Sequence, residues 1–255
     1  RLRAWTLPAM LGAAGIVALG AGLPTAMVLR WWSSGMTAGS ETFVSSLGPA
    51  RDPAWRSLLV AGATAAIVAA ASFPIVLVVH RAEAVGGAGW VKRLRGLALV
   101  GYGMPGVVVG FALVRLALDF DDGMRAASLS VRLYETLPLL LTGYFVRCLA
   151  EAMGPASAAA RRLHPDQLDA AIGLGAGFAR TWARVGAPAI APGVAAGAAL
   201  AFLTVIKELP ITLILRPREF DTLAFALFDA LTEAMHTRAA PMALVILLLS
   251  GAVVW

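Results

Sequence analysis

The sequence predicts an all-α membrane protein, and its composition and the length and pattern of its apolar runs all favour this class. Hydrophobic residues make up 59% of the 255 residues and charged residues 14%, which lies outside the range of ordinary soluble domains. The apolar residues gather in runs of about 20, the length that an α-helix needs to cross a bilayer. These runs are longer than strands and do not alternate, and a single segment in lipid must satisfy its own backbone hydrogen bonds.

Five runs are long enough to span the membrane, and a sixth is incomplete. We expect helices over 7–29, 57–79, 96–118, 134–153 and 189–209, and a truncated helix over 241–255. The chain starts at Arg1 without a methionine and stops at Trp255 within the sixth run. We therefore expect residues 1–255 to be a single transmembrane domain cut from a longer polypeptide.

The distribution of Lys and Arg predicts the orientation of this domain. With the connections assigned to alternating sides, ten basic residues fall on one side and eight on the other. The side with ten is expected to be cytoplasmic, because basic loops are retained there. The bases are spread over short loops and do not form a stripe on one helix, so no nucleic-acid partner is expected.

Two pairs of small residues predict close helix packing. Gly106 and Gly110 lie in the third run, and Gly193 and Gly197 lie in the fifth. Both pairs have the spacing that lets helix backbones approach each other. We expect dense packing inside the bundle rather than a dimerisation surface.

Charged residues also occur inside and between the runs. Arg147 and Glu151 are four residues apart in the fourth run, so they are expected to pair on one helix face. The acidic cluster Asp119, Asp121 and Asp122 is expected to form a polar turn rather than an iron site. The single cysteine excludes an internal disulfide and a multi-cysteine metal site.

The cytoplasmic connection 154–187 is unusual because it has helical structure of its own. Pro165 and Asp166 are typical of a helix start, and Asp169 adds a charge that favours the same helix end. Three glycines then interrupt the helix: Gly173, Gly175 and Gly177.

A second short helix is expected after these glycines, closed by Pro188. Phe178 and Trp182 are four residues apart on one face of this helix. Exposed aromatic residues favour docking to a partner, whereas an amphipathic loop lying on lipid headgroups would use the same residues. The pattern alone leaves both readings open.

The spacing of the whole connection resembles a known loop. The connection reads Asp169-Ala170-Ala171, three residues, Gly175, nine residues and Val185-Gly186-Ala187-Pro188. This spacing resembles the EAA loop of ATP-binding-cassette (ABC) importer permeases. The chain has Asp, Val and Ala at positions where the family has Glu, Ile and Leu. The resemblance implies that this hairpin is a coupling helix that docks on a cytoplasmic ATPase. The coupling residues it implies are Asp166, Asp169, Ala170, Ala171, Gly175, Phe178, Trp182 and Pro188.

A second signature follows the fifth run. Lys207-Glu208-Leu209-Pro210 and the later 220–224 segment, Phe-Asp-Thr-Leu-Ala, resemble the second half of ferric-iron importer permeases. Lys207, Glu208 and Pro210 are candidate pathway or gate residues. The alternative is that the two charged side chains reach the outer interface and pair locally.

The resemblance implies a six-helix type I permease domain of the MetI-like fold in a bacterial inner membrane, without catalytic residues or a cofactor of its own. The partners it implies are a cytoplasmic ABC ATPase dimer, a periplasmic or lipid-anchored substrate-binding protein and a second permease half. Ferric iron is the expected cargo, with thiamine, phosphonate or another small solute as the alternative. A channel or a non-transporting scaffold is the hypothesis from another class.

Overall fold

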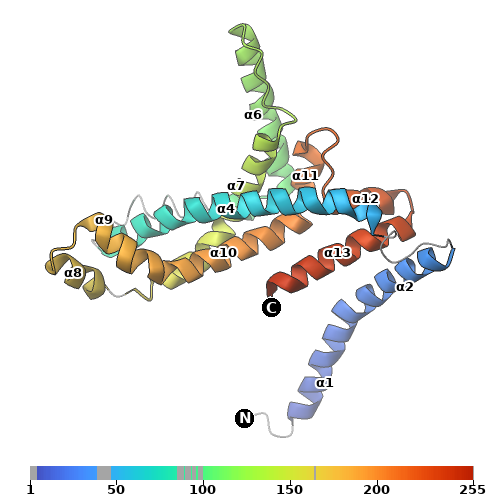
Figure 1. Cartoon of the computed structure of the whole chain (residues 1–255), viewed down its shortest axis with the longest axis horizontal. Coiled ribbons are helices and arrows are strands. Elements are labelled where there is room, and N and C mark those ends of the chain that lie inside the picture. Colours follow the sequence, from blue (N-terminus) through green and yellow to red (C-terminus); the bar gives the residue numbers. More distant parts are fainter. Residues whose placement is uncertain are drawn as a thin grey trace. The chain divides into compact units, whose positions relative to one another are not determined.

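The computed structural model describes residues 5–38, 47–84, 89, 93, 96, 100–163 and 165–254. These residues form helices and connecting loops, with no strand among them (Figure 1). The chain divides into two compact units, one made of residues 1–54 with 223–255 and the other of residues 55–222.

Five helical segments are long and apolar enough to cross a membrane. The first runs through α1 (Thr6–Val17), the π-turn η2 (Ala18–Gly22) and α2 (Leu23–Ala38), and the others lie in α4 (Gly48–Ala84), α7 (Leu137–Ala160), η3 (Trp182–Gly186) with α10 (Ala187–Lys207), and α13 (His236–Val254). The predicted class of an all-α, multi-pass membrane protein is confirmed.

The third run differs from the uninterrupted helix predicted over 96–118. Residues 97–99 lie outside the described part, and the helix present at 100–103 stops at Met104 and Pro105 before α6 (Gly106–Ala126) begins. Proline has no backbone N–H and disfavours a helical conformation of the residue before it, which accounts for the break. From its middle to its end, α6 carries several charged residues: Arg115, Asp119, Asp121, Asp122 and Arg125.

The last helix begins earlier than predicted. The run expected from Pro241 starts as α13 at His236, so Pro241 lies within the helix. The carbonyl of Met235 accepts the N–H groups of Arg238 and Ala239, which starts the first turn ahead of the proline. The helix therefore reaches crossing length within the described residues.

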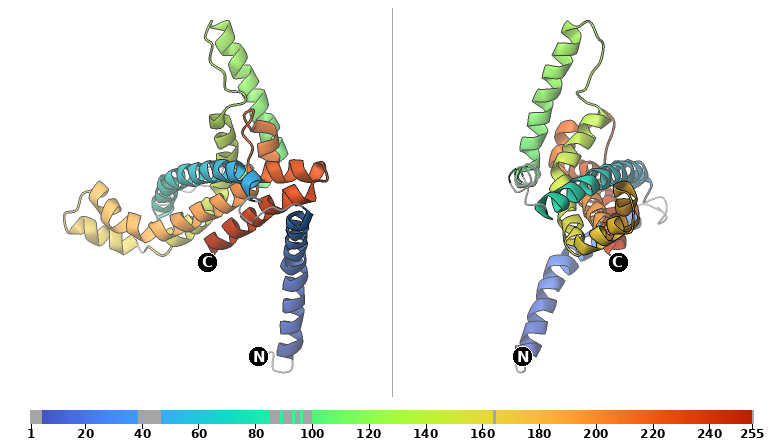
Figure 2. Two further views of the ribbon diagram at one scale, coloured as in Figure 1. Left: turned by 45° about the vertical axis from the view of Figure 1, so that its right-hand side comes forward. Right: turned by 90° about the vertical axis from the view of Figure 1, so that its left-hand side faces the viewer.

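In the unit of residues 55–222, α7 packs along α10. A Cβ added at Gly193 would lie 2.5 Å from the carbonyl oxygen of Pro155, and one at Gly197 would lie 2.5 Å from the carbonyl oxygen of Ala152. The two backbones therefore touch, and the predicted packing role of this glycine pair is confirmed. Figures 1 and 2 show the 161–186 hairpin at one end of the α7–α10 pair.

In the other unit, α13 packs against α12 (Leu223–Thr232) and α2. Leu223 and Met242 are buried together with Ala50 from the start of α4. At the amino end of α13, the ring of His236 stacks on Trp31 with the ring centroids 4.7 Å apart.

Candidate functional site

The hairpin between α7 and α10 is built from two short helices and a glycine turn. Helix α8 (Pro165–Gly173) is followed by Gly175, whose φ of +84° lies in the left-handed region. The N–H of Ala176 donates to the carbonyl of Ala171, and the N–H of Gly175 donates to the carbonyl of Ile172. These two bonds form a Schellman motif with Gly175 at its left-handed position, so the glycine of the loop pattern has a defined structural role.

The tip of the hairpin exposes apolar side chains that the sequence reasoning missed. Leu174 is 89% exposed and Ile172 is 40% exposed. The neighbouring Gly173, Gly175 and Gly177 have open space where a Cβ would stand. The sequence pattern that indicates this exposure is a leucine between two glycines at a turn, because the neighbouring glycines have no side chains to cover it.

Trp182, in contrast, is buried. It lies in η3 after α9 (Phe178–Thr181) and is 7% exposed. It belongs to a core cluster drawn from α4, α7, the 161–163 turn, α8 and α10, whose other buried members are Val76, Ala156, Ala160, Leu163, Leu168 and Ile190. The indole also covers Gly186, where a Cβ would collide with the ring. Trp182 therefore anchors the hairpin to the bundle rather than facing outward as the sequence prediction placed it.

Pro188 does not close the second helix of the hairpin. The helix passes through the π-turn η3 into α10, and the N–H of Ala187 bonds to the carbonyl of Trp182. The proline lacks the N–H that a regular turn would use there, and the wider turn precedes it. The described side chains of Asp166 and Ala170 are exposed, Ala171 is half-buried, and Asp169 and Phe178 belong to α8 and α9.

The second candidate site lies where α10 ends. The chain leaves the helix at Glu208 and Leu209 and resumes as α11 (Pro210–Leu215). The Glu208 carboxylate accepts the N–H of Ile211, and the Thr212 hydroxyl donates to the Glu208 carbonyl. Lys207 is exposed. Glu208 and Pro210 thus belong to a helix interruption, as the proline predicted.

Three glycines allow the segment around α11 to pack closely against α6 and α7. A Cβ at Gly106 would lie 2.7 Å from Oε1 of Glu208, and one at Gly110 would lie 2.9 Å from the Ile214 side chain. A Cβ at Gly143 of α7 would lie 2.8 Å from the Leu215 side chain. The prediction that Gly106 and Gly110 serve close packing is therefore confirmed.

The sequence predicted that Arg147 and Glu151 pair with each other. In the structure, each of them bonds to another helical segment instead. The Arg147 guanidinium donates to the carbonyl of Tyr102 at 3.1 Å and lies over the Tyr102 ring, 5.3 Å from its centroid. The Glu151 carboxylate accepts the Thr204 hydroxyl at 2.8 Å. Tyr144, one turn before Cys148, shares a 2.7 Å hydrogen bond with Thr212. Polar contacts therefore connect α7 to three other segments.

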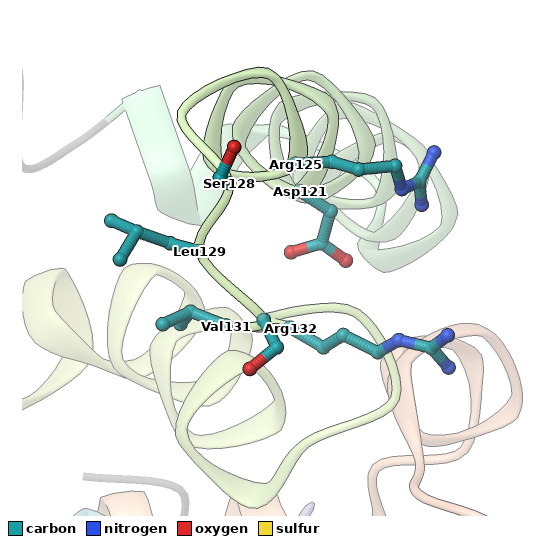
Figure 3. A pocket seen from close by; sticks show the side chains of 7 residues that line it. Asp121, Arg125, Ser128, Leu129, Val131 and Arg132 are labelled. Carbon is teal, nitrogen blue, oxygen red and sulfur yellow. The ribbon is translucent and has the colours of Figure 1, made fainter.

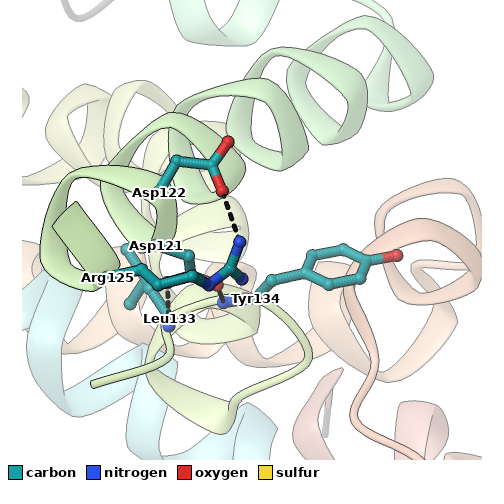
Figure 4. A network of polar contacts seen from close by, with 5 residues as sticks. All are labelled: Asp121, Asp122, Arg125, Leu133 and Tyr134. Carbon is teal, nitrogen blue, oxygen red and sulfur yellow. Dashed lines mark hydrogen bonds and ion pairs between the residues drawn. The ribbon is translucent and has the colours of Figure 1, made fainter. Parts of the chain in front are cut away.

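The acidic residues Asp119, Asp121 and Asp122 lie in the last turns of α6 and not in a turn of their own as predicted, although two of them bind neighbouring groups there. The Asp121 carboxylate accepts the N–H groups of Leu133 and Tyr134 at 2.6 and 3.2 Å, and Asp122 pairs with Arg125 at 3.0 Å (Figure 4). These contacts fix the 127–135 loop against α6. Within the described residues, no group of three or more His, Cys, Asp or Glu could hold a metal ion.

An open pocket of about 310 Å³ lies at this loop. Figure 3 shows the side chains of Arg125 and Arg132 extending to the same side, with the Asp121 carboxylate between them. One carboxylate, Asp121, and two guanidinium groups, Arg125 and Arg132, line the pocket. Asp122 is not part of the lining but pairs with Arg125, which offsets one of the two positive charges.

The chain can be compared with proteins of known role. No family model matches it. It is 27% identical over 236 residues to the "Fe(3+)-transport system permease protein FbpB 2" of Haemophilus influenzae. The chain resembles a ferric-iron permease. The alignment covers 92% of this chain and 44% of that protein, so the chain spans less than half of the relative's length.

Proposed function

We propose that the chain is one transmembrane half of the permease of an ATP-driven, binding-protein-dependent importer of ferric iron in a bacterial inner membrane. The likeness to a Fe(3+)-transport permease over 92% of the chain carries the proposal. The set of membrane-crossing helices and the glycine-turned hairpin with the loop spacing of importer permeases support it. The chain itself supplies no catalytic step, and ATP hydrolysis belongs to a separate subunit.

The partners are part of the same proposal. A cytoplasmic ABC ATPase dimer would dock on the hairpin, a periplasmic or lipid-anchored binding protein would deliver the cargo, and a second permease half would complete the pathway. An α7 of 24 residues is about 36 Å long at 1.5 Å per residue, enough to cross the hydrocarbon core. The hairpin follows α7 and the 127–135 loop precedes it, so the two lie on opposite sides of the membrane.

The coupling hairpin divides its work between two groups of residues. Leu174 and Ile172 form the exposed apolar tip that a groove on the ATPase would cover. Trp182 is packed between α8 and the transmembrane helices, so movement of the tip is transmitted to α7 and α10. The other predicted coupling residues form the framework of this hairpin: Asp166, Asp169, Ala170, Ala171, Gly175, Phe178 and Pro188.

Uptake of radioactive ferric iron tests the cargo. Cells that carry the full-length permease with its ATPase and binding protein should accumulate ferric iron faster than cells lacking the permease gene. Labelled thiamine and phosphonate serve as parallel cargoes. Equal iron uptake with and without the gene would refute the assignment of iron, and selective loss of thiamine or phosphonate uptake would replace it.

Crosslinking tests the docking surface. A Leu174→Cys variant labelled with a thiol-reactive photocrosslinker, in a Cys148→Ala background, should capture the ATPase subunit. Leu129→Cys is the matched control, because Leu129 is also an exposed leucine but lies in the loop at the other end of α7. Capture of the ATPase by position 129 and not by position 174 would reverse the proposed orientation, and capture by neither would refute docking through the hairpin.

A further inference from the structure

Contacts between segments far apart in the sequence gather at one end of the unit of residues 55–222. Arg56 of α4 donates to the backbone carbonyl of Glu219, and its guanidinium lies over the Phe220 ring, 5.6 Å from the centroid. Arg218 pairs with the carboxylate of Glu135, just ahead of α7, at 3.1 Å. The turn that follows α11 is therefore fastened both to α4 and to the chain that enters α7.

These contacts lie at the end of the unit that is farthest from the hairpin. Val76 of α4 belongs to the cluster around Trp182 at the base of the hairpin, and Arg56 precedes Val76 by 20 residues (76 minus 56), about 30 Å of helix. Glu135 precedes α7, whereas the hairpin follows it. Because α4 and α7 are both long enough to cross a bilayer, the contacts and the hairpin fall on opposite sides of the membrane.

The two loops that meet here contain turns with an unusual backbone conformation. Glu135 and Glu219 have φ of +58° and +59°, in the left-handed region that favours glycine. A hydrogen bond closes each turn, with 2.6 Å across 133–136 and 3.2 Å across 217–220. A non-glycine residue keeps such a conformation where the surrounding contacts enforce it, and residues of this kind cluster at functional positions. The contacts between the two turns therefore help to hold the shape of each.

Each turn also has an anchor of its own. The buried Asp121 carboxylate of α6 accepts the 133–134 N–H groups, as Figure 4 shows. Arg216, directly after α11, pairs with Asp221 at 2.8 Å across the second turn. A continuous set of contacts thus runs from α6 through both turns to α4.

We use the term brace for the turns 133–136 and 217–220 together with the side chains of Arg56 and Asp121. We propose that the brace is a mechanical coupling element, which joins the far ends of α4, α6, α7 and α11 into one body so that a movement of the hairpin reaches the opposite side of the membrane. This inference rests on the proposed permease function and assigns a role in it to residues at the end opposite the ATPase.

The interruption between α10 and α11 is the reason that a brace is needed. Helices α7 and α10 are in backbone contact at Gly193 and Gly197, so they move together. The chain then leaves the helix at Glu208 and Leu209, which gives α11 freedom to move relative to α10. The brace removes this freedom, because it ties the exit of α11 to α4 and to the start of α7. One exposed ion pair contributes little, so the strength of the brace comes from several contacts that act on the same two turns.

Hydrogen exchange tests whether the brace is one body, without cargo or ATPase. In the full-length protein in detergent, Arg56→Gln removes contacts to the second turn and should speed amide exchange several-fold at 133–134 in the first turn. The matched control Arg115→Gln breaks an exposed ion pair within α6 and should leave these rates unchanged. Arg218→Gln, which removes an exposed side chain, is the second variant if Arg56→Gln does not fold, with an expected increase of up to about fivefold. Unchanged exchange at 133–134 in the folded variant would overturn the proposal.

Transport measured together with ATP hydrolysis tests the coupling role. In proteoliposomes that hold the full-length permease with its ATPase and binding protein, Glu135→Arg places a like charge opposite Arg218 and should raise the ATP hydrolysed per ferric ion imported several-fold. The double variant Glu135→Arg with Arg218→Glu restores an opposite pair and should return this ratio toward the wild-type value. The control Glu233→Arg reverses an exposed glutamate of the other unit and should leave the ratio unchanged. A parallel fall of hydrolysis and import, or no rescue in the double variant, would overturn the coupling role.

A crosslink tests whether the brace stays closed during transport. Glu135→Cys with Arg218→Cys, in a Cys148→Ala background, removes the ion pair and should raise the same ratio. A short bifunctional thiol reagent that joins the two cysteines should restore it. Loss of import after crosslinking would show that the two turns separate during the cycle, which would overturn a brace that moves as one body.

The assays separate this inference from the proposed function. Wild-type protein that fails to import ferric iron would refute the proposed cargo, and the hydrogen-exchange test of the brace would still apply. Normal iron import together with unchanged exchange at 133–134 in Arg56→Gln would refute the brace alone.

Discussion

Gly197→Ala is expected to destabilise the α7–α10 pair, although alanine is the better helix former. The added Cβ would lie 2.5 Å from the carbonyl oxygen and 2.9 Å from the Cα of Ala152. Ordinary contact begins at 3.4 Å, so the two backbones must separate by about 0.9 Å (3.4 minus 2.5). Both obstructing atoms belong to a backbone, so no side-chain rotation relieves the collision.

The magnitude follows from two opposing effects. A gap of 0.5–1 Å forfeits roughly a quarter to a half of the dispersion attraction between facing atoms, and inserting a methyl group into a packed interior costs about 1–3 kcal/mol. Replacing a glycine by alanine in a helix interior stabilises the helix by up to about 1 kcal/mol. We therefore expect a net loss of about 1–2 kcal/mol, which lowers the melting temperature by roughly 2–8 °C.

Thermal denaturation of the detergent-solubilised full-length protein, followed by size-exclusion chromatography, measures this loss. The matched control is Gly62→Ala in α4, because Gly62 is also helical and has nothing within 4 Å of the added Cβ. Gly62→Ala should melt at or slightly above the wild-type temperature. A Gly197→Ala variant that melts as high as Gly62→Ala would show that α7 and α10 are not in backbone contact.

Three further changes test local interactions. Gly175→Ala should lower the free energy of unfolding by about 1–2 kcal/mol, because φ is +84° there, and it should speed amide hydrogen exchange at Ala176. Gly177→Ala should have neither effect. Asp121→Ala removes both carboxylate bonds to the 133–134 amides, so it should lower the free energy of unfolding by about 1–3 kcal/mol and speed hydrogen exchange at those amides. The control Asp119→Ala breaks only an exposed ion pair, so it should lower the free energy of unfolding by less than about 1 kcal/mol. Tyr144→Phe removes the bond to Thr212 and should lower stability by about 0.5–1.5 kcal/mol in the same melting assay; an unchanged melting temperature would contradict that bond.

The sequence predicted those features that depend on local chemistry. Pro165 starts α8 and Gly175 ends it, because one residue lacks an N–H and the other tolerates a positive φ. Long apolar runs became helices because lipid leaves the backbone no other partner. The glycine spacing in 193–197 predicted backbone contact correctly, although it did not identify α7 as the neighbour.

Other features depended on partners distant in sequence. An aromatic residue on a loop helix is compatible with either a docking surface or a core, and only the packing of α4, α7 and α8 around Trp182 decided for the core. Leu174 is exposed for the converse reason, since no segment of the described chain covers it.

The sequence by itself therefore determined the all-α membrane class, the glycine-turned hairpin and the helix breaker at Pro210. The tertiary structure alone decided that Arg147 binds Tyr102 and not Glu151, and that Glu208 lies against Gly106. Spacing along one helix reports only which side chains share a face. Where a charge finds its partner in a bundle depends on which other helix ends are brought within reach, and that is fixed by packing between segments far apart in the chain.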